Sequence, residues 1–174
     1  ILGLDTINDP SNLGTIIRLC DWFGVHKIVC SKDTVDCYNS KVVQASMGSL
    51  TRVSLQYLDL DDFLKKTELP VFIADMNGTN VYQSALPNEG VLVMGNEANG
   101  ISNTVKELAT DVLCIPRFGQ VQQTESLKYF RLFLLHLHAQ LKHQFSPCLS
   151  EYYSVFRIYN MFNKLLIRKK NSIT

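Results

Sequence analysis

The first segment with residue types suited to anion chemistry spans residues 8–18 and reads NDPSNLGTIIR. Its Asp-Pro pair and Asn12 favour turns, and Gly14 permits a close backbone approach at the start of a helix. Because the free N–H groups at a helix N-terminus attract phosphate or carboxylate, the segment predicts an anion site. Arg18 is expected on about the first turn of that helix, where its planar guanidinium would suit a phosphate. The alternative interpretation is a plain loop with a surface arginine.

The second segment, residues 92–102, reads LVMGNEANGIS. Gly95 follows an apolar run, where the absence of a side chain lets a ligand reach the backbone, and Gly100 opens the next predicted helix. Glu97 carries a carboxylate close to the predicted sheet, and burial of that charge is costly without a partner. We therefore expect Glu97 to pair with Arg18 or with backbone N–H groups of the first segment. The alternative is a strand–turn–helix junction with capping residues.

The third segment, residues 115–127, reads IPRFGQVQQTESL. Pro116 lacks a backbone N–H and ends the preceding strand, which leaves backbone groups outside any ladder. Such free N–H and C=O groups can bind the edge of an adenine. The alternative is a surface loop.

Short apolar runs alternate with segments of helical periodicity, and these elements must position the three segments. Strands are predicted at residues 1–4, 27–30, 52–57, 71–74, 91–94 and 112–115, with a turn at Asn77-Gly78. Helices are predicted at residues 14–23, ended by Gly24, at 40–47 with Ser40 as the cap, after Asp59 and after Ser102. Alternation of strands and helices, with strands that are nearly all apolar apart from the alternating run at 52–57, indicates an α/β fold with a mostly parallel sheet and helices on both faces. Ligands bind at the carboxyl ends of such strands, where all three segments begin.

Composition restricts the class of protein. The chain has 174 residues, a length that predicts one globular domain. Its formal net charge of +1 gives no strong excess of positive charge for binding nucleic acid. Five cysteines, an odd number without a CxxC pair, argue against a disulfide framework or a zinc site and favour a reducing, cytoplasmic location. No signal peptide or membrane-spanning stretch is predicted. No metal is implied, because His136, His138 and His143 are interpreted as residues on a helix surface.

The three segments together resemble the signature motifs of one family. Their order and spacing match those of the SpoU (TrmH-like) RNA 2′-O-ribose methyltransferases of the SPOUT superfamily, and residues 75–86 resemble the middle segment of that family. The resemblance covers residues 1–127 and rests on three motifs: Asn12-x-Gly14-x-x-x-Arg18, Met94-Gly95-x-Glu97-x-x-Gly100-Ile101-Ser102, and Ile115-Pro116 followed by Ser126-Leu127.

The resemblance implies a fold, a cofactor and partners. The fold would be of the SPOUT type, with a carboxyl-terminal trefoil knot, and the protein would be a homodimer. S-adenosyl-L-methionine would bind bent in the knot, with Gly95, Ile115 and Leu127 lining the adenosine pocket. The remaining residues expected at the cofactor site are Met94, Asn96, Gly100 and Pro116.

The implied reaction is methyl transfer to a ribose 2′-hydroxyl of tRNA or rRNA. Asn12, Arg18, Glu97 and Ser126 would form the catalytic face. Arg18 is the family's candidate base, but an arginine with a pKa above about 12 is a poor base, so we expect it to bind the RNA phosphate instead. A catalytically inactive RNA-binding or dimerisation module is the alternative function. An unrelated nucleotide-binding α/β enzyme is a further alternative, weakened by the absence of G-x-G-x-x-G and P-loop motifs.

The resemblance ends after Leu127, where the family continues with Asn and small residues. Here Lys128 is followed by the bulky Tyr129 and Phe130, which would not fit the space of the knotted helix. If Lys128 is encoded AAA, deleting one base from a permitted codon choice gives Asn-Ile-Ser-Val-Ser, so we hypothesise a frameshifted tail over residues 128–174. The catalytic domain is expected at residues 1–127. Because the chain begins directly in a strand-like run, an amino-terminal RNA-binding domain is expected to be missing.

Overall fold

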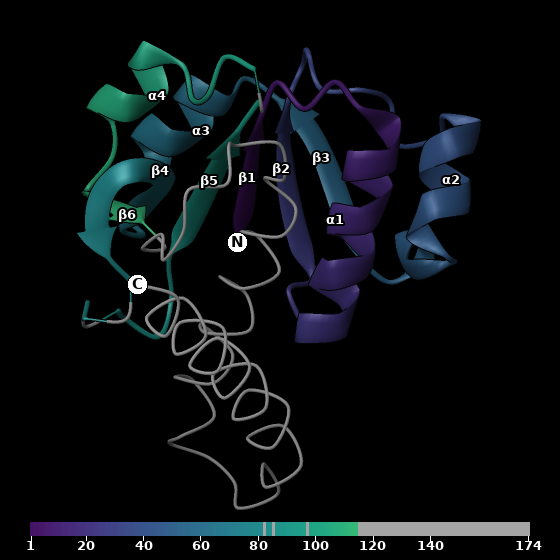
Figure 1. Ribbon diagram of the computed structural model, residues 1–174, viewed down its shortest axis with the longest axis horizontal. Helices are drawn as coiled ribbons and strands as arrows, with labels where there is room; N and C mark the ends of the chain where they lie inside the picture. The colour runs from purple at the N-terminus through teal and green to yellow at the C-terminus, as the bar shows by residue number, and fades with distance from the viewer. Residues whose placement is uncertain (82, 85, 97, 115–174) are drawn as a thin grey trace, which may run out of the picture. The chain divides into compact units, whose positions relative to one another are not determined.

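The computed structural model describes residues 1–81, 83–84, 86–96 and 98–114, and these contain one six-stranded sheet (Figure 1). The strand order is β3-β2-β1-β5-β4-β6, and every pairing is parallel. The strands are β1 (Leu2–Asp5), β2 (Lys27–Ser31), β3 (Ser54–Leu58), β4 (Val71–Asn80), β5 (Val91–Gly95) and β6 (Asp111–Cys114). The predicted parallel α/β sheet is therefore confirmed.

Helices cover the sheet from both sides (Figure 1). The helical elements are α1 (Pro10–Phe23), α2 (Ser40–Ser46), the 3-10 turn η1 (Ser49–Thr51), α3 (Leu60–Lys66) and α4 (Asn103–Glu107). Alternate residues of β5 separate the two cores, because Leu92 joins the cluster of α1 and α2 while Val91 and Val93 join the cluster of α3 and α4. Two buried faces explain why β1, β2 and β5 are largely apolar, whereas the edge strand β3 carries the exposed Ser54, Gln56 and Tyr57.

Local chemistry sets the ends of the helices, and two predicted starts were wrong. The carboxylate of Asp9 accepts a hydrogen bond from the Asn12 N–H at 2.8 Å, so α1 begins at Pro10 and not at Gly14. Asn39, and not Ser40, caps α2. The predicted cap of α3 by Asp59 is confirmed, as is the end of α1 at Gly24, where φ is +72°.

Strand β4 is longer than predicted. It continues to Asn80, and its pairing with β6 shifts register between Ala74 and Thr79, both of which pair with Leu113. The predicted Asn77-Gly78 turn lies inside this irregularity. A Cβ at Gly78 would lie 2.5 Å from the Val112 carbonyl oxygen, so the close approach of the two strands requires glycine there.

The order of the strands creates a switch point between β1 and β5. The chain proceeds from β1 through β2 to β3 on one side, whereas β5 pairs with β1 on the other side, with Asp5 opposite Gly95 at the carboxyl end. Connections diverge at such a point and leave a crevice for ligands. The predicted knot and the tail after residue 127 lie outside the described residues. None of the helices in the described part is long and apolar enough to cross a membrane.

Candidate functional site

Asp5 ends β1 with a buried carboxylate, which is only 7% exposed. Its Oδ2 accepts a hydrogen bond from the Ser102 N–H at 2.8 Å, and its Oδ1 accepts one from the Thr6 hydroxyl at 3.1 Å. A buried carboxylate is tolerated only with such partners. Asp5 therefore connects the end of β1 to the residue that precedes α4.

Thr6 follows in a backbone conformation that is rare for a β-branched residue, with φ at +58°. Its N–H donates to the Ser31 hydroxyl at 2.8 Å, and its carbonyl accepts from the Asn96 side-chain Nδ2 at 2.8 Å. The next N–H, of Ile7, donates to the Thr34 hydroxyl at 3.3 Å. Strained backbone of this kind persists only where its surroundings hold it, and it is concentrated at functional sites.

After β5, hydrogen bonds link Asn96 with residues 98–100, and these described residues form the loop that precedes α4. The Gly100 N–H donates to the Asn96 carbonyl at 2.7 Å, and the Asn96 Oδ1 accepts from the Ala98 N–H at 2.7 Å and the Asn99 N–H at 3.3 Å. Gly100 closes the loop with φ at +70°. A Cβ on Gly95 would overlap the Gly100 carbonyl and Ile101, so the missing side chain accommodates the loop's own backbone. Ligand contact by Gly95, Met94, Asn96 or Gly100 stays a prediction.

Helix α1 carries the first motif in an arrangement different from the predicted loop. Asn12 lies in the first turn, and Gly14 faces α2, where a Cβ would lie 2.5 Å from the Ala45 Cβ and 2.7 Å from the Val42 carbonyl oxygen. Gly14 thus serves the close packing of two helices. Its presence in the motif is explained without a ligand.

Arg18 lies on the third turn of α1 and not on the first, so its predicted place at the helix mouth was wrong. It lies eight positions after Pro10, which corresponds to about 12 Å along the helix axis. Arg18 is exposed, and in the described part of the chain it forms no ion pair. Asn12 lies six residues before Arg18, about 9 Å along the axis and on a different side of the helix. Within one copy, α1 alone does not bring the two side chains together.

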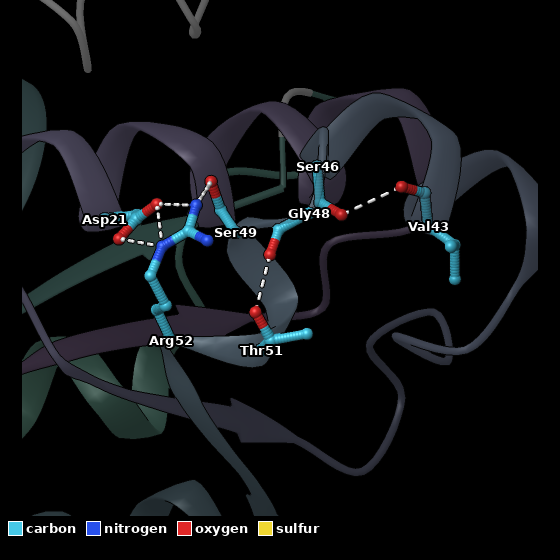
Figure 2. Close-up of polar contacts among 7 residues, drawn as sticks. All are labelled: Asp21, Val43, Ser46, Gly48, Ser49, Thr51 and Arg52. Carbon is cyan, nitrogen blue, oxygen red and sulfur yellow. Dashed lines mark hydrogen bonds and ion pairs between the residues drawn. The ribbon is translucent and has the colours of Figure 1, made fainter.

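The acidic residue nearest to Arg18 in sequence, Asp21, is engaged elsewhere. Figure 2 shows the Arg52 guanidinium against its carboxylate, with Nε at 3.1 and 2.9 Å from the two carboxylate oxygens and Nη2 at 2.6 Å from Oδ2. Nη2 also lies 3.5 Å from the Ser49 hydroxyl. Hydrogen bonds from Arg52 and Ser49 lower the pKa of Asp21. This contact fastens the end of α1 to the residue that follows η1, and it occupies the carboxylate of Asp21.

Several predicted site residues lie outside the described residues. These are Glu97, Ile115, Pro116, Ser126 and Leu127. The predicted contact between Glu97 and Arg18 therefore stays a prediction. Among the described residues, no group of three His, Cys, Asp or Glu side chains is arranged to hold a metal ion.

Sequence reasoning missed the polar groups at the ends of β1 and β2, namely Asp5, Thr6, Ser31 and Thr34. Asp5 did carry a usable signal, because it is a carboxylate directly after an apolar run that had been recognised as a strand. The hydroxyls had none, since Ser and Thr after a strand are common turn residues. Their partners lie 25 to 27 residues away.

Comparison with known proteins places this geometry in a family. The SpoU rRNA Methylase family profile matches residues 1–127. The chain is 32% identical over 129 residues to the 23S rRNA (guanosine-2′-O-)-methyltransferase RlmB of Neisseria meningitidis, covering 70% of the chain and 51% of the relative. It is 27% identical over 141 residues to the 23S rRNA (guanosine(2553)-2′-O)-methyltransferase RlmP of Bacillus subtilis, covering 79% and 57%.

Solved structures agree with these relatives. A protein of the TrmH family from Porphyromonas gingivalis superposes with a TM-score of 0.74 at 35% identity, covering 80% of this chain and 59% of that one. The AdoMet-bound rRNA methyltransferase of Sinorhizobium meliloti superposes with a TM-score of 0.72 at 27% identity, covering 80% and 56%. The chain spans between half and two thirds of the lengths of these four proteins. With all three signature motifs inside the matched range and the sheet topology shared, the chain belongs to the SpoU rRNA methylase family.

Proposed function

We propose that this protein transfers a methyl group from S-adenosyl-L-methionine to a ribose 2′-hydroxyl of RNA, with ribosomal RNA as the favoured substrate and tRNA as the alternative. The observation that carries the proposal is the family match over residues 1–127, which includes all three motifs. The names of two curated relatives specify 2′-O-methylation of 23S rRNA. The activity is a proposal because the chain covers only about half of those relatives.

The cofactor would bind at the carboxyl ends of β1 and β5. The loop at residues 96–100 is held by its own hydrogen bonds and by Thr6, which fits a site that is formed before the ligand arrives. Met94 and Gly95 are half-buried beside it, and Ala98 to Gly100 are exposed. The Sinorhizobium meliloti relative contains AdoMet in the same fold, which supports this choice of cofactor. Ile115, Pro116 and Leu127 are proposed to complete the site.

In the proposed reaction, the bound sulfonium supplies an activated methyl group. The task left to this chain is to hold the ribose hydroxyl oxygen in line with the methyl group and to keep the two from binding in unproductive orientations. Arg18 is exposed and always charged, so we assign it to binding an RNA phosphate rather than to acting as the base. The proton of the 2′-hydroxyl would leave through this arginine–phosphate contact. Asn12, Glu97 and Ser126 remain the other proposed members of the catalytic face.

The test is transfer of labelled methyl from S-adenosyl-L-methionine to ribosomal RNA, with the product identified by the alkali resistance of 2′-O-methylated linkages. Transfer to a defined ribose supports the proposal. Transfer of the label to a base, or none to any RNA while S-adenosylhomocysteine binds, would contradict it. Isothermal titration with S-adenosylhomocysteine separates the enzyme from the inactive RNA-binding or dimerisation module, which would show no binding below millimolar concentration. The specific observation that favours the module is Lys128, which follows the last residue of the family match.

We also propose that the protein is a homodimer that uses the exposed face of α1. Trp22 is 70% exposed and lies four residues after Arg18, so both side chains share one face of the helix. Aromatic residues and arginine are enriched at protein–protein interfaces, which supports this face as the contact between two copies. A second copy on this face would place Arg18 at the interface, where it can reach the partner's site. Light scattering should give a dimer for the natural chain and a monomer for Trp22→Ala.

For the tail, we propose that residues 128–174 are read out of frame. The family match ends at Leu127, which is the last residue before the sequence departs from the motif. The nucleotide sequence around Leu127 decides the matter. A single-base deletion there should restore an open family-like continuation, and the hypothesis is wrong if no such deletion does.

The proposed location is the cytoplasm, where thiols stay reduced. Four cysteines of the described part are free, and burial raises the pKa of Cys20 and of Cys30 to about 12. Epitope-tagged protein should fractionate with cytoplasmic ribosomes, and recovery from a secreted fraction would contradict the proposal.

A further inference from the structure

Two hydrogen bonds cross from the end of β1 to the segment between β5 and α4. The Asp5 carboxylate accepts from the Ser102 N–H, and the Thr6 carbonyl accepts from the Asn96 side chain, each at 2.8 Å. The partners are 97 and 90 residues apart in sequence. The two bonds hold the loop where it begins, at Asn96, and two residues after Gly100, at Ser102.

These two bonds are not part of the strand ladder. The β1–β5 pairing ends with Asp5 opposite Gly95, and both bonds involve groups beyond that pair. The two bonds therefore add to the strand pairing, and together with the burial of Ile101 they fix the segment before α4 relative to β1. The contacts inside the loop hold Asn96 to Gly100 but do not fasten the loop to the sheet.

On the β1 side, the residues that form these two hydrogen bonds are themselves held in place. The Ser31 hydroxyl accepts from the Thr6 N–H, the Thr34 hydroxyl accepts from the Ile7 N–H, and the two hydroxyls lie 3.2 Å apart. Thr6 is held in the left-handed region, where its carbonyl meets Asn96. Threonine rarely adopts this conformation, so contacts with residues far away in sequence must hold it there. Thr6 therefore presents its carbonyl to Asn96 in a fixed position.

We propose that Asp5 and Asn96 are positioning residues that dock residues 98–102, the segment that leads into α4, onto β1 in the conformation that the cofactor requires. The proposal rests on the proposed function for its cofactor, but the docking itself is a property of this chain. Asp5 acts as a hydrogen-bond acceptor, and its negative charge is not needed at the reacting atoms. The Asn96 side chain acts through the loop, because its oxygen accepts from the Ala98 N–H and its nitrogen donates to the Thr6 carbonyl.

The experiment compares hydrogen exchange and S-adenosylhomocysteine binding in the full chain and three variants. Asp5→Ala removes the acceptor. Asp5→Asn keeps an oxygen for the Ser102 N–H and offers an N–H to the Thr6 hydroxyl. Thr110→Val is the matched control, because the Thr110 hydroxyl accepts a backbone N–H from Val71 at 3.0 Å, 39 residues away and at the opposite end of the sheet.

We expect Asp5→Ala to speed amide exchange across residues 98–102 by roughly 10-fold or more, while β2 and β5 keep their protection. Its affinity for S-adenosylhomocysteine should fall by a similar factor, and KM for the methyl donor should rise more than kcat falls. Asp5→Asn should restore both exchange and affinity to within a few-fold. Thr110→Val should lose global stability without changing loop exchange or affinity.

If Asp5→Ala folds and the amide exchange of residues 98–102 is unchanged, the inference is overturned, whether or not the affinity for S-adenosylhomocysteine changes. An Asp5→Asn variant that exchanges and binds as poorly as Asp5→Ala would also overturn it, because the acceptor would then not be what matters. If Asp5→Ala does not fold, Asn96→Asp provides the comparison from the loop side, because it keeps an oxygen for the Ala98 N–H and removes the N–H that donates to the Thr6 carbonyl. If the natural chain shows the exchange pattern but transfers no methyl group and binds no S-adenosylhomocysteine, the proposed function fails while the docking role stands.

Discussion

Replacing Gly14 with alanine sets two effects on α1 against each other. Alanine is favoured over glycine inside a helix by about 1 kcal/mol, so propensity alone predicts a more stable protein. Packing predicts the reverse, because the new Cβ would lie 2.5 Å from the Ala45 Cβ and 2.7 Å from the Val42 carbonyl oxygen. Carbon atoms in contact are normally about 3.5 to 4.0 Å apart, so α1 and α2 would have to separate.

The packing effect should win. Forcing an extra methyl group into a filled site costs about 1 to 3 kcal/mol, and the upper end applies here because one neighbour is a backbone carbonyl that cannot change rotamer. After the gain in propensity, we expect Gly14→Ala to lower the free energy of unfolding by about 2 kcal/mol. In a protein of this size that corresponds to roughly 4 to 8 °C in Tm.

Urea denaturation followed by circular dichroism measures the change. Gly24→Ala is the control, since no atom lies within 4 Å of its Cβ but its φ of +72° is unfavourable for alanine, so it should cost about 1 to 2 kcal/mol without disturbing packing. Adding Ala45→Gly to Gly14→Ala should recover part of the loss as a favourable coupling, whereas Ala45→Gly should not rescue Gly24→Ala. A Gly14→Ala protein that is more stable than the natural one would refute the reasoning.

Three further predictions address the remaining groups. Arg18→Ala should nearly abolish methyl transfer while the affinity for S-adenosylhomocysteine stays within a few-fold. Arg18→Lys should restore little activity, because lysine lacks the planar guanidinium. Turnover of Arg18→Ala like that of the natural protein would remove Arg18 from the site. Cys20 and Cys30 should resist iodoacetamide at pH 8 in the folded protein, because burial raises the pKa of each to about 12, and mass spectrometry should find them alkylated only in denaturant. Arg52 lowers the pKa of Asp21 in the folded state, so the contribution of this pair to stability is present above the unfolded pKa and is lost as pH falls through the folded pKa. The stability difference between the natural protein and Asp21→Asn, measured by urea unfolding, should therefore shrink between neutral pH and pH 3, and a constant difference would argue against the pair as its source.

The sequence by itself determined the α/β class, the six strands, their burial on both faces and the family. Those features depend on the period of apolar residues and on short motifs, both of which are local properties of the chain. Residues 1–127 carry the three motifs in order, and their recognition did not need the sheet order. Membership in the SpoU rRNA methylase family was thus predictable before any contact was known.

Only the tertiary structure decided what several motif residues do. Helical spacing from a wrong start placed Arg18 on the first turn, whereas capping by Asp9 moves the start to Pro10 and Arg18 to the third turn. The role of Gly14 became visible only with α2 packed against it. Asp5 was overlooked because its partner, Ser102, is 97 residues away. The pairing of β1 with β5 brings these two together, and that pairing arises from the packing of the whole sheet, which no local pattern records.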